Sequence, residues 1–165
     1  MHPRIAGILC GVPSNSAADP TNARILEELQ ADGRMTFAEL GRRVGLSAPA
    51  VAERVQRLED DGAILGYRAI VNPRAVGYSL SAIVRVRPAP DRLKTVADVA
   101  RKTGEVVECH RVTGDDCYVM KVHLRDVEHL EEVIDRFAAL GQTTSSIMQS
   151  SPVAERPLAT TLGGT

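Results

Sequence analysis

The sequence predicts an α+β protein in two parts: an N-terminal helix-turn-helix domain of the winged-helix-like kind, then a ferredoxin-like sandwich of βαββαβ order. Two observations lead to this prediction. Apolar residues recur at helical spacing over residues 19–64, whereas residues 79–151 alternate between strand-like and helix-like stretches. Between them, Tyr67–Val71 followed by Asn72-Pro73 is typical of a short strand and a linker.

Composition excludes several classes of protein. The chain has 165 residues, of which 44% are apolar and 25% charged, so a wholly disordered or fibrous protein is excluded. With 20 basic and 21 acidic residues, a uniformly basic coat for nucleic acid is also excluded, although a local basic patch is not. The 2 Phe and 3 Tyr, with no Trp, are too few for stacking along single-stranded nucleic acid.

Cysteine use and apolar runs predict the cellular location. An odd count of 3 Cys fits a reduced, cytoplasmic protein better than a disulfide-bonded secreted one. No stretch approaches the ~20 apolar residues of a membrane-spanning helix, so no membrane association is expected. The short apolar run Ile5–Val12 lacks a convincing cleavage site, and we interpret residues 1–18 as a flexible N-terminal extension.

Three helices are expected in residues 19–66, each beginning at a capping residue. Asp19 caps the first, with Pro20 in its first turn. Thr36 caps the second and forms a capping box with Glu39, and Gly45 supplies the turn that follows. The residues expected to face the core from these two helices are Ile25, Leu26, Leu29, Phe37, Leu40 and Val44.

The third helix is capped by Ser47 and carries Val51, Val55 and Leu58 as one apolar stripe. A short helix, a Gly-containing turn and a longer helix with small residues at its start are typical of a helix-turn-helix, although an ordinary three-helix subdomain has the same spacing. The unpaired N–H groups at such a helix start suit a phosphate. The candidate DNA-binding residues are Ser47, Ala48, Ala50, Arg54 and Arg57, with Arg42 and Arg43 as phosphate contacts.

The second half alternates between strands and helices. Strands are expected at 80–87, 105–112, 117–124 and 143–149, with Gly114 in the loop of the central hairpin. One helix lies between 93 and Gly104, and Asp126 caps a second one that Gly141 ends. The second helix is expected to turn Val127, Leu130, Ile134 and Phe137 inward. Because both helices cover one sheet face, the bare face favours a homo-oligomer.

Two groups of residues invite a chemical interpretation. Cys109, His110, Cys117 and His123 suggest a metal site or a nucleophilic thiol, but the hairpin pairs Cys117 with Val112, about 10 Å along the ladder from Cys109. His123 is expected farther away, near Val106. We therefore expect no metal, no cofactor and no catalytic cysteine. Asp115 and Asp116 form either a solvated turn or an interface loop for a small zwitterion, to which Thr143, Thr144, Ser145 and Ser146 add hydroxyl groups.

The order and spacing of several short motifs are similar to those of the Lrp/AsnC family of prokaryotic transcription regulators. The resemblance runs from Asp19 to about Pro152. The motifs that carry it are Asn22–Leu29, Asp32-Gly33-Arg34, Glu39–Ser47, Val51, Arg54-Val55, Arg57-Leu58-Glu59, Gly62, Ile64, Gly66-Tyr67, Val112–Asp116, Thr144 and Ile147.

This resemblance implies a regulator of amino-acid metabolism that binds double-stranded DNA. The implied parts are a DNA-binding domain at 19–66, a hinge strand and linker at 67–78, a ligand-sensing and oligomerisation domain at 79–152 and a C-terminal tail at 153–165. Sensing domains pair into homodimers, which assemble into octamers and hold an amino-acid effector between them. The implied effector residues are Gly114, Asp115 and Asp116, with Thr143 and Thr144 as further contacts.

One departure concerns the hairpin. Members of the family often have an aromatic residue and then Asp after the acidic residue that follows the hairpin glycine, whereas this chain has Asp116 and Cys117 there. Two other functions also stay open on residues alone. One is an interaction module whose helical half binds protein. The other is a small enzyme, which would need a converging acid, base or nucleophile that the sequence does not show.

Overall fold

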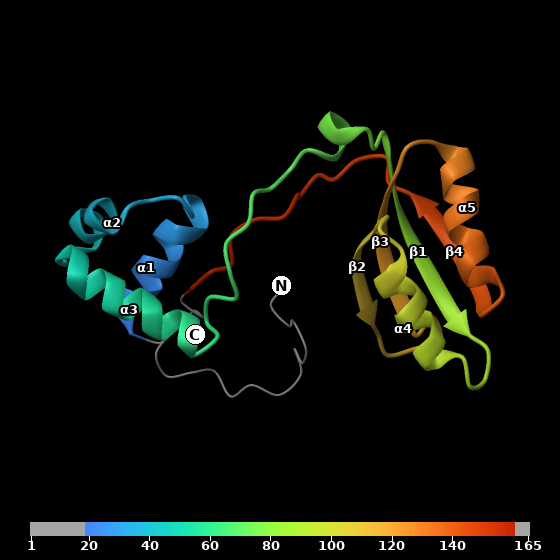
Figure 1. Cartoon of the computed structure of the whole chain (residues 1–165), viewed down its shortest axis with the longest axis horizontal. Coiled ribbons are helices and arrows are strands. Elements are labelled where there is room, and N and C mark those ends of the chain that lie inside the picture. The colour runs from blue at the N-terminus through green and yellow to red at the C-terminus, as the bar shows by residue number, and fades with distance from the viewer. Residues whose placement is uncertain (1–18, 161–165) are drawn as a thin grey trace. The chain divides into compact units, whose positions relative to one another are not determined.

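The computed structural model describes residues 19–160 and divides the chain into two compact units (Figure 1). The helical unit runs up to Ala69 and includes the residues from Val153 onward, and the sheet unit comprises Ile70–Pro152. The predicted N-terminal extension, with its apolar run Ile5–Val12, lies outside the described residues. Within residues 19–160 no helix is both long and apolar enough to cross a membrane.

The helical unit contains α1 (Pro20–Ala31), α2 (Phe37–Val44) and α3 (Ala48–Asp60). The side chains of Asp19, Thr36 and Ser47 accept backbone hydrogen bonds at the three helix starts, which confirms the predicted caps. Gly45 ends α2 in the left-handed region with φ of 75°. The buried core of the unit consists of Ile25, Leu40, Val44, Val51, Val55 and Leu58.

One predicted core residue of this unit lies at the surface. Phe37 is 44% exposed, whereas Leu40 is fully buried. Phe37 is the first residue of α2, and side chains on a helix tilt toward its N-terminus. Its ring therefore lies outside the buried core, to which Leu40 and Val44 of the same helix belong.

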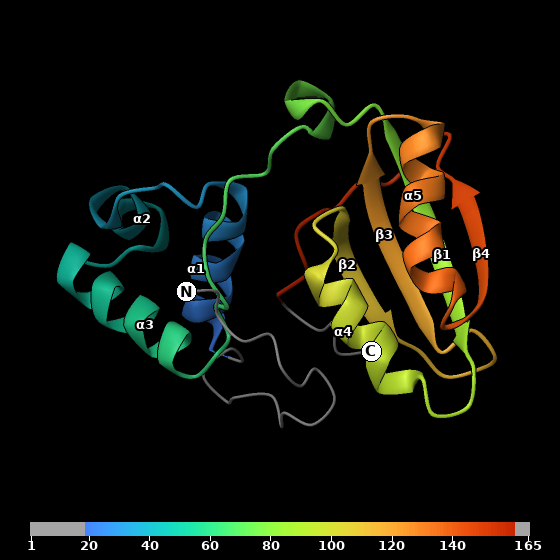
Figure 2. The same cartoon turned by 45° about the vertical axis from the view of Figure 1, so that its right-hand side comes forward.

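The sheet unit contains β1 (Leu80–Pro88), α4 (Leu93–Lys102), β2 (Val106–Arg111), β3 (Tyr118–Leu124), α5 (Val127–Ala138) and β4 (Gly141–Ile147), preceded by the 3₁₀ turn η2 (Pro73–Val76). This order confirms the predicted βαββαβ fold. The strands form one antiparallel sheet in the order β2-β3-β1-β4. Figure 2 shows α4 and α5 on one face of this sheet.

Alternation along the central strands builds the core between the sheet and the two helices. In β1, Ala82, Val84 and Val86 are fully buried, and β3 alternates in the same way. Phe137 of α5 is the largest side chain with no exposed surface. The opposite sheet face carries Ile83 and Val119 among charged side chains of β1 and β3, and neither α4 nor α5 covers it.

Three predictions in this unit are wrong. Val127 is 53% exposed because it begins α5, one turn before the buried Leu130. Strand β4 starts at Gly141, two residues earlier than predicted, so this glycine does not end the helix. It belongs to the sheet, where the neighbouring backbone of β1 leaves no room for a side chain.

The hinge strand predicted at Tyr67–Val71 is absent. This segment has no strand hydrogen bonds in the described part of the chain, and Ile70 is 84% exposed. A strand requires a neighbouring strand to pair with, and no other described segment of this single chain pairs with residues 67–71. The extended segment instead leads to η2, which Asn72 caps.

The segment after Pro152 returns to the helical unit. Gln30 of α1 exchanges two hydrogen bonds with the backbone of Leu158, at 2.7 and 3.1 Å. Glu27 accepts a hydrogen bond from Thr160 at 2.7 Å, and Arg68 pairs with Glu155 at 3.1 Å. The predicted C-terminal tail is therefore attached to α1 and to the linker as far as residue 160.

A partly buried ion cluster attaches the start of β2 to α5. Glu105 accepts hydrogen bonds from His129 Nε2 at 2.9 Å and from Arg136 Nη1 at 3.1 Å. Because His129 Nδ1 accepts the amide N–H of Arg125, Nε2 is the ring nitrogen that carries the proton. Burial alone would raise the pKa of Glu105. Its own backbone N–H, His129 and Arg136 outweigh burial and lower the pKa from 4.5 to about 2.

The lowered pKa predicts acid-dependent stability. Its contribution, at most about 3 kcal/mol, is complete above pH 4.5 and is lost as the pH falls toward 2, since protons then bind the unfolded chain more tightly. In urea unfolding, the free energy of unfolding of wild type should exceed that of Glu105→Gln, and the margin between the two should narrow as the pH falls from 5 to 2. A margin that stays constant over this range would contradict the cluster.

Candidate nucleic-acid interface and effector loop

The start of α3 offers an uncrowded helix N-terminus. Ser47 is exposed, and its hydroxyl accepts the N–H of Ala50 at 3.4 Å. Ala48 and Ala50 are half-buried and add only methyl groups. A helix start with small side chains allows close approach by another backbone, and its remaining N–H groups attract an anion.

Arg57 lies one turn from the end of α3 on its exposed face. Its Nη2 atom is 2.5 Å from Oε1 of Glu53, and both side chains are at least 65% exposed. Such a surface pair at i and i+4 contributes little to stability, so the guanidinium is available for exchange with another anion.

Arg54 has a different environment from Arg57. Its Nη1 atom lies 2.9 Å from Oδ1 of Asn22 and 3.4 Å from Oδ1 of Asp19, and the side chain is 35% exposed. Hydrogen bonds from Asn22 and Thr21 and the nearby Arg54 together lower the pKa of Asp19, against partial desolvation. Arg54 therefore joins α3 to the first turn of α1, which sequence reasoning did not predict.

The last turn of α2 carries the other candidate arginines. Arg43 pairs with Glu39 at 2.9 Å and with Glu28 at 2.8 Å, and Arg42 pairs with Glu39. Arg42 remains 77% exposed. The proposed DNA-binding face thus consists of arginines with acidic partners, and a phosphate must compete with those carboxylates. The spacing of Glu39 to Arg43 and of Glu53 to Arg57 in the sequence is the signal for these pairs.

The hairpin loop between β2 and β3 has a defined geometry. Gly114 has φ of 104°, a region that glycine adopts readily. Asp115 is bound by Arg87 of β1, from Nη2 to Oδ2 at 3.0 Å and from Nε to the backbone oxygen at 3.1 Å. Asp116 is half-buried in the same loop. Arg87 is a residue of this site that sequence reasoning missed.

The predicted threonines lie at the same end of the sheet but not beside the loop. Thr144 pairs with Arg85 of β1, and Gln142 pairs with Arg87. Strand β1 therefore separates β4 from the β2–β3 hairpin. Within one described chain, Thr143 and Thr144 do not converge with Asp115 and Asp116.

The pairing of β2 with β3 bears on the metal alternative. Val112 donates its N–H to the oxygen of Cys117 at 2.8 Å, as the hairpin predicted, and Cys109 pairs with Met120. His123 lies near Val106, as predicted: Val106 pairs with Val122, and the backbone N–H of His123 donates to the backbone oxygen of Glu105 at 3.0 Å. A bulge between Val106 and Glu108 shifts the register there by one residue. Among the described residues no group of His, Cys, Asp and Glu has a metal-binding arrangement.

Comparison with known proteins identifies the family. Residues 19–59 match the AsnC-type helix-turn-helix domain, and residues 81–158 match the Lrp/AsnC ligand binding domain. The HTH-type transcriptional regulator LrpA of Mycobacterium tuberculosis is 37% identical over 147 residues, which cover 84% of this chain and 91% of that protein. This chain belongs to the Lrp/AsnC family.

Further relatives agree with this assignment. The Lrp/AsnC chain is 40% identical over 119 residues to the leucine-responsive regulatory protein of Escherichia coli K12, covering 70% and 73% of the two proteins. The proteins of this family are DNA-binding transcriptional regulators and not enzymes, which removes the enzyme alternative.

Solved structures of family members share the fold. A transcriptional regulator of Neisseria meningitidis in complex with L-methionine superposes with a TM-score of 0.79 at 29% identity, over 85% of this chain and 95% of that one. The feast or famine regulatory protein of M. tuberculosis in complex with L-methionine has a TM-score of 0.76 at 36% identity, over 84% and 96%. The predicted helix-turn-helix and ferredoxin-like architecture is thus confirmed.

Proposed function

We propose that this regulator acts in the cytoplasm on genes of amino-acid metabolism and binds double-stranded DNA through α3 and the end of α2. The observation that carries the proposal is the open start of α3 followed by the exposed Arg57 on the same helix. In this arrangement Ser47, Ala48 and Ala50 approach the floor of the major groove, and Arg57 reaches a base edge. Arg42 and Arg43 contact phosphates. Arg54 holds α3 in place, and DNA would have to displace Asp19 and Asn22 to recruit it.

The largest single side-chain effect on DNA affinity is expected at Arg57. Arg57→Ala should weaken binding by about 1–3 kcal/mol, or roughly 5- to 150-fold, if the guanidinium contacts a base. The measurement is an electrophoretic mobility shift with a duplex from the protein's own upstream region. Arg101→Ala is the matched control because Arg101 belongs to an exposed ion pair of the sheet unit. Equal affinity of Arg57→Ala and wild type would reject this role.

The DNA-binding unit is proposed to be a homodimer that assembles further into an octamer. Its support is the sheet face of β1 and β3 opposite α4 and α5, which neither of these two helices of the sheet unit covers. A dimer places two α3 helices in successive major grooves, about 34 Å apart along the duplex. A single protomer is mildly acidic and is therefore expected to bind DNA weakly. Two DNA-binding sites joined in one dimer bind the duplex with a higher combined affinity.

The effector is proposed to be an amino acid bound at the hairpin loop. Two structural relatives are described as L-methionine complexes, which supports this class of ligand. Loop N–H groups around Gly114 would donate hydrogen bonds to the α-carboxylate, and the carboxylate of Asp116 would accept hydrogen bonds from the α-ammonium group. Asp115 is already paired with Arg87. Since Thr143 and Thr144 lie across β1, they would contribute from a neighbouring subunit.

An amino-acid screen by thermal shift tests the effector site. A ligand at 100 times its Kd stabilises the folded state by about 2.7 kcal/mol, so a true effector should raise Tm clearly. Asp116→Asn should abolish most of that rise, because the ammonium group loses its counter-charge. The control is Asp135→Asn on the exposed face of α5. An unchanged rise in Asp116→Asn would exclude this residue from the site.

A further inference from the structure

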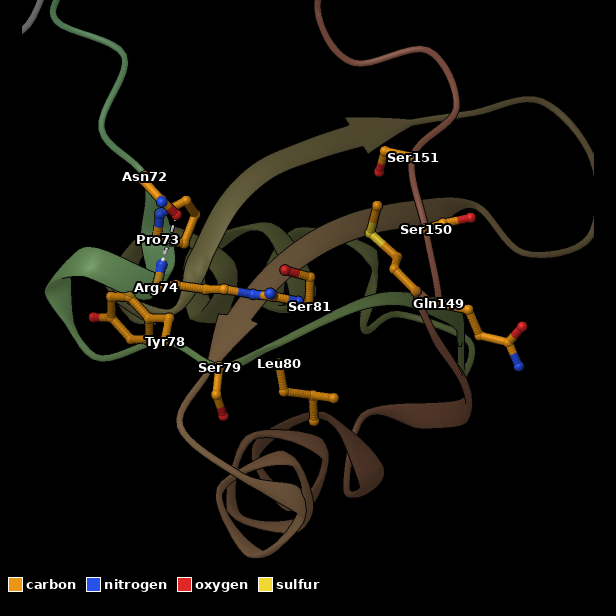
Figure 3. A pocket seen from close by; sticks show the side chains of 11 residues that line it. Asn72, Pro73, Arg74, Tyr78, Ser79, Leu80, Ser81, Gln149, Ser150 and Ser151 are labelled. Carbon is orange, nitrogen blue, oxygen red and sulfur yellow. Dashed lines mark hydrogen bonds between the residues drawn. The ribbon is translucent and has the colours of Figure 1, made fainter.

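A cavity of about 220 Å³ lies at the end of the sheet where β1 begins. One wall is the segment from Asn72 through η2 to Ser81, and the other is the segment 148–151 that follows β4 (Figure 3). Both walls belong to the sheet unit. The hairpin loop and the DNA-binding face contribute no residue to it.

The lining has an unbalanced charge. It contains one arginine, Arg74, and no carboxylate. No hydrogen bond or ion pair of the Arg74 guanidinium occurs in the described part of the chain, unlike Arg57 or Arg87, which hold acidic partners. Figure 3 shows the Arg74 side chain running along the cavity toward Ser81. An unpaired guanidinium directed into a polar cavity favours an anion.

The backbone that presents Arg74 is already fixed. The side chain of Asn72 accepts the N–H of Arg74 at 3.0 Å and caps η2. The turn ends at Gly77, with φ of 95°, and the N–H of Tyr78 donates to the oxygen of Pro73 at 2.9 Å. Little backbone entropy therefore remains to be lost when a ligand binds.

Hydroxyl groups complete the donor set. The Ser81 hydroxyl lies 2.8 Å from Nδ1 of His123. When Nδ1 carries the proton and donates to Ser81, the serine O–H is free to donate into the cavity. The opposite wall adds Ser150 and Ser151, whose hydroxyl groups form no hydrogen bond within the described residues. A guanidinium and several hydroxyl donors match the oxygens of a carboxylate or phosphate.

We propose that this cavity binds a small oxyanion, a metabolite that bears a carboxylate or phosphate group. Its volume of about 220 Å³ is below the ~300–1,000 Å³ of sites for drug-sized molecules, which favours a small ligand. The bound anion joins the segment after the linker to the segment after β4. Both segments lead directly to the helical unit along the chain. The bound anion therefore restricts the conformational freedom of the two segments that connect the sheet unit to the helical unit.

Equilibrium dialysis of the full-length protein tests the proposal. Labelled inorganic phosphate and labelled succinate are the two probes, each at constant ionic strength. At least one probe should bind saturably with one site per chain, and the probe that binds decides between phosphate and carboxylate. Arg74→Gln should weaken that binding about tenfold or more, as expected for loss of a charged hydrogen-bond donor. Ser81→Ala should weaken it several-fold.

Two control variants localise the binding. Arg92→Gln removes an exposed arginine before α4 and should leave the affinity unchanged. Asp116→Asn should also leave it unchanged, which separates this cavity from the effector loop. Absence of saturable binding for both probes, equal binding by wild type and Arg74→Gln, or equal losses in Arg74→Gln and Arg92→Gln would overturn the proposal.

Discussion

Gly41→Ala is expected to unfold the helix-turn-helix at moderate temperature and to abolish DNA binding with it. A Cβ atom at Gly41 would lie 2.5 Å from the backbone oxygen of Leu46, in the turn that joins α2 to α3. The N–H of Leu46 donates to the oxygen of Gly41 at 2.9 Å, so the turn cannot move away without losing this bond. Overpacking of this kind costs about 1–3 kcal/mol, and the better helix propensity of Ala returns no more than about 1 kcal/mol.

The matched control for Gly41→Ala is Gly33→Ala in the same unit. A Cβ atom at Gly33 would meet Tyr67 at 3.5 Å, an ordinary contact. Thermal unfolding followed by circular dichroism, together with the DNA mobility shift, should therefore separate the two variants. If both variants unfold and bind DNA like wild type, this result would contradict the close contact between Gly41 and the α2–α3 turn.

A larger loss of stability is expected from Gly141→Ala in the sheet unit. A Cβ atom at this position would lie 2.1 Å from the oxygen of Arg87, 2.8 Å from Cα of Pro88 and 2.9 Å from N of Ala89. All three atoms belong to backbone, so no side chain can rotate to relieve the overlap. We expect a loss of about 3 kcal/mol or more in the free energy of unfolding, or failure of β4 to pair with β1.

Gly141→Ala should also impair the effector response. Gln142 follows directly and pairs with Arg87, which holds Asp115 in the hairpin loop. Gly104→Ala is the control, because a Cβ atom there would meet nothing within 4 Å. Urea unfolding of the two variants measures the difference. Equal stability of the two variants would contradict the observed contact between β4 and the end of β1.

Local chemistry explains which elements could be predicted from the sequence. The caps at Asp19, Thr36 and Ser47 depend on a side chain and a backbone N–H two or three residues away, so the sequence shows them directly. The alternation in β1 and the single apolar stripe of α3 likewise depend on periodicity alone. The fold class and element order follow from these signals.

Features that depend on distant residues could not be predicted. Arg54 binds Asn22 and Asp19, which lie 32 and 35 residues away in the sequence, and nothing in its own helix indicates those partners. Gly141 resembles a helix end in sequence, but packing against Arg87 determines its role. For the effector loop, Asp115 and Asp116 were evident, whereas the contribution of Arg87 required the pairing of β1 with its neighbours.

The most direct test of the central claim uses a photo-crosslinking amino acid in place of Gln56. This residue lies exposed on α3, and its replacement breaks only a surface hydrogen bond with Asp60. The same amino acid in place of Ala139, after α5, is the control. If α3 binds the duplex, irradiation of the complex with the upstream DNA should attach position 56 to DNA and leave position 139 free. A shifted complex in which position 56 forms no adduct, or no more than position 139, would contradict DNA binding through α3.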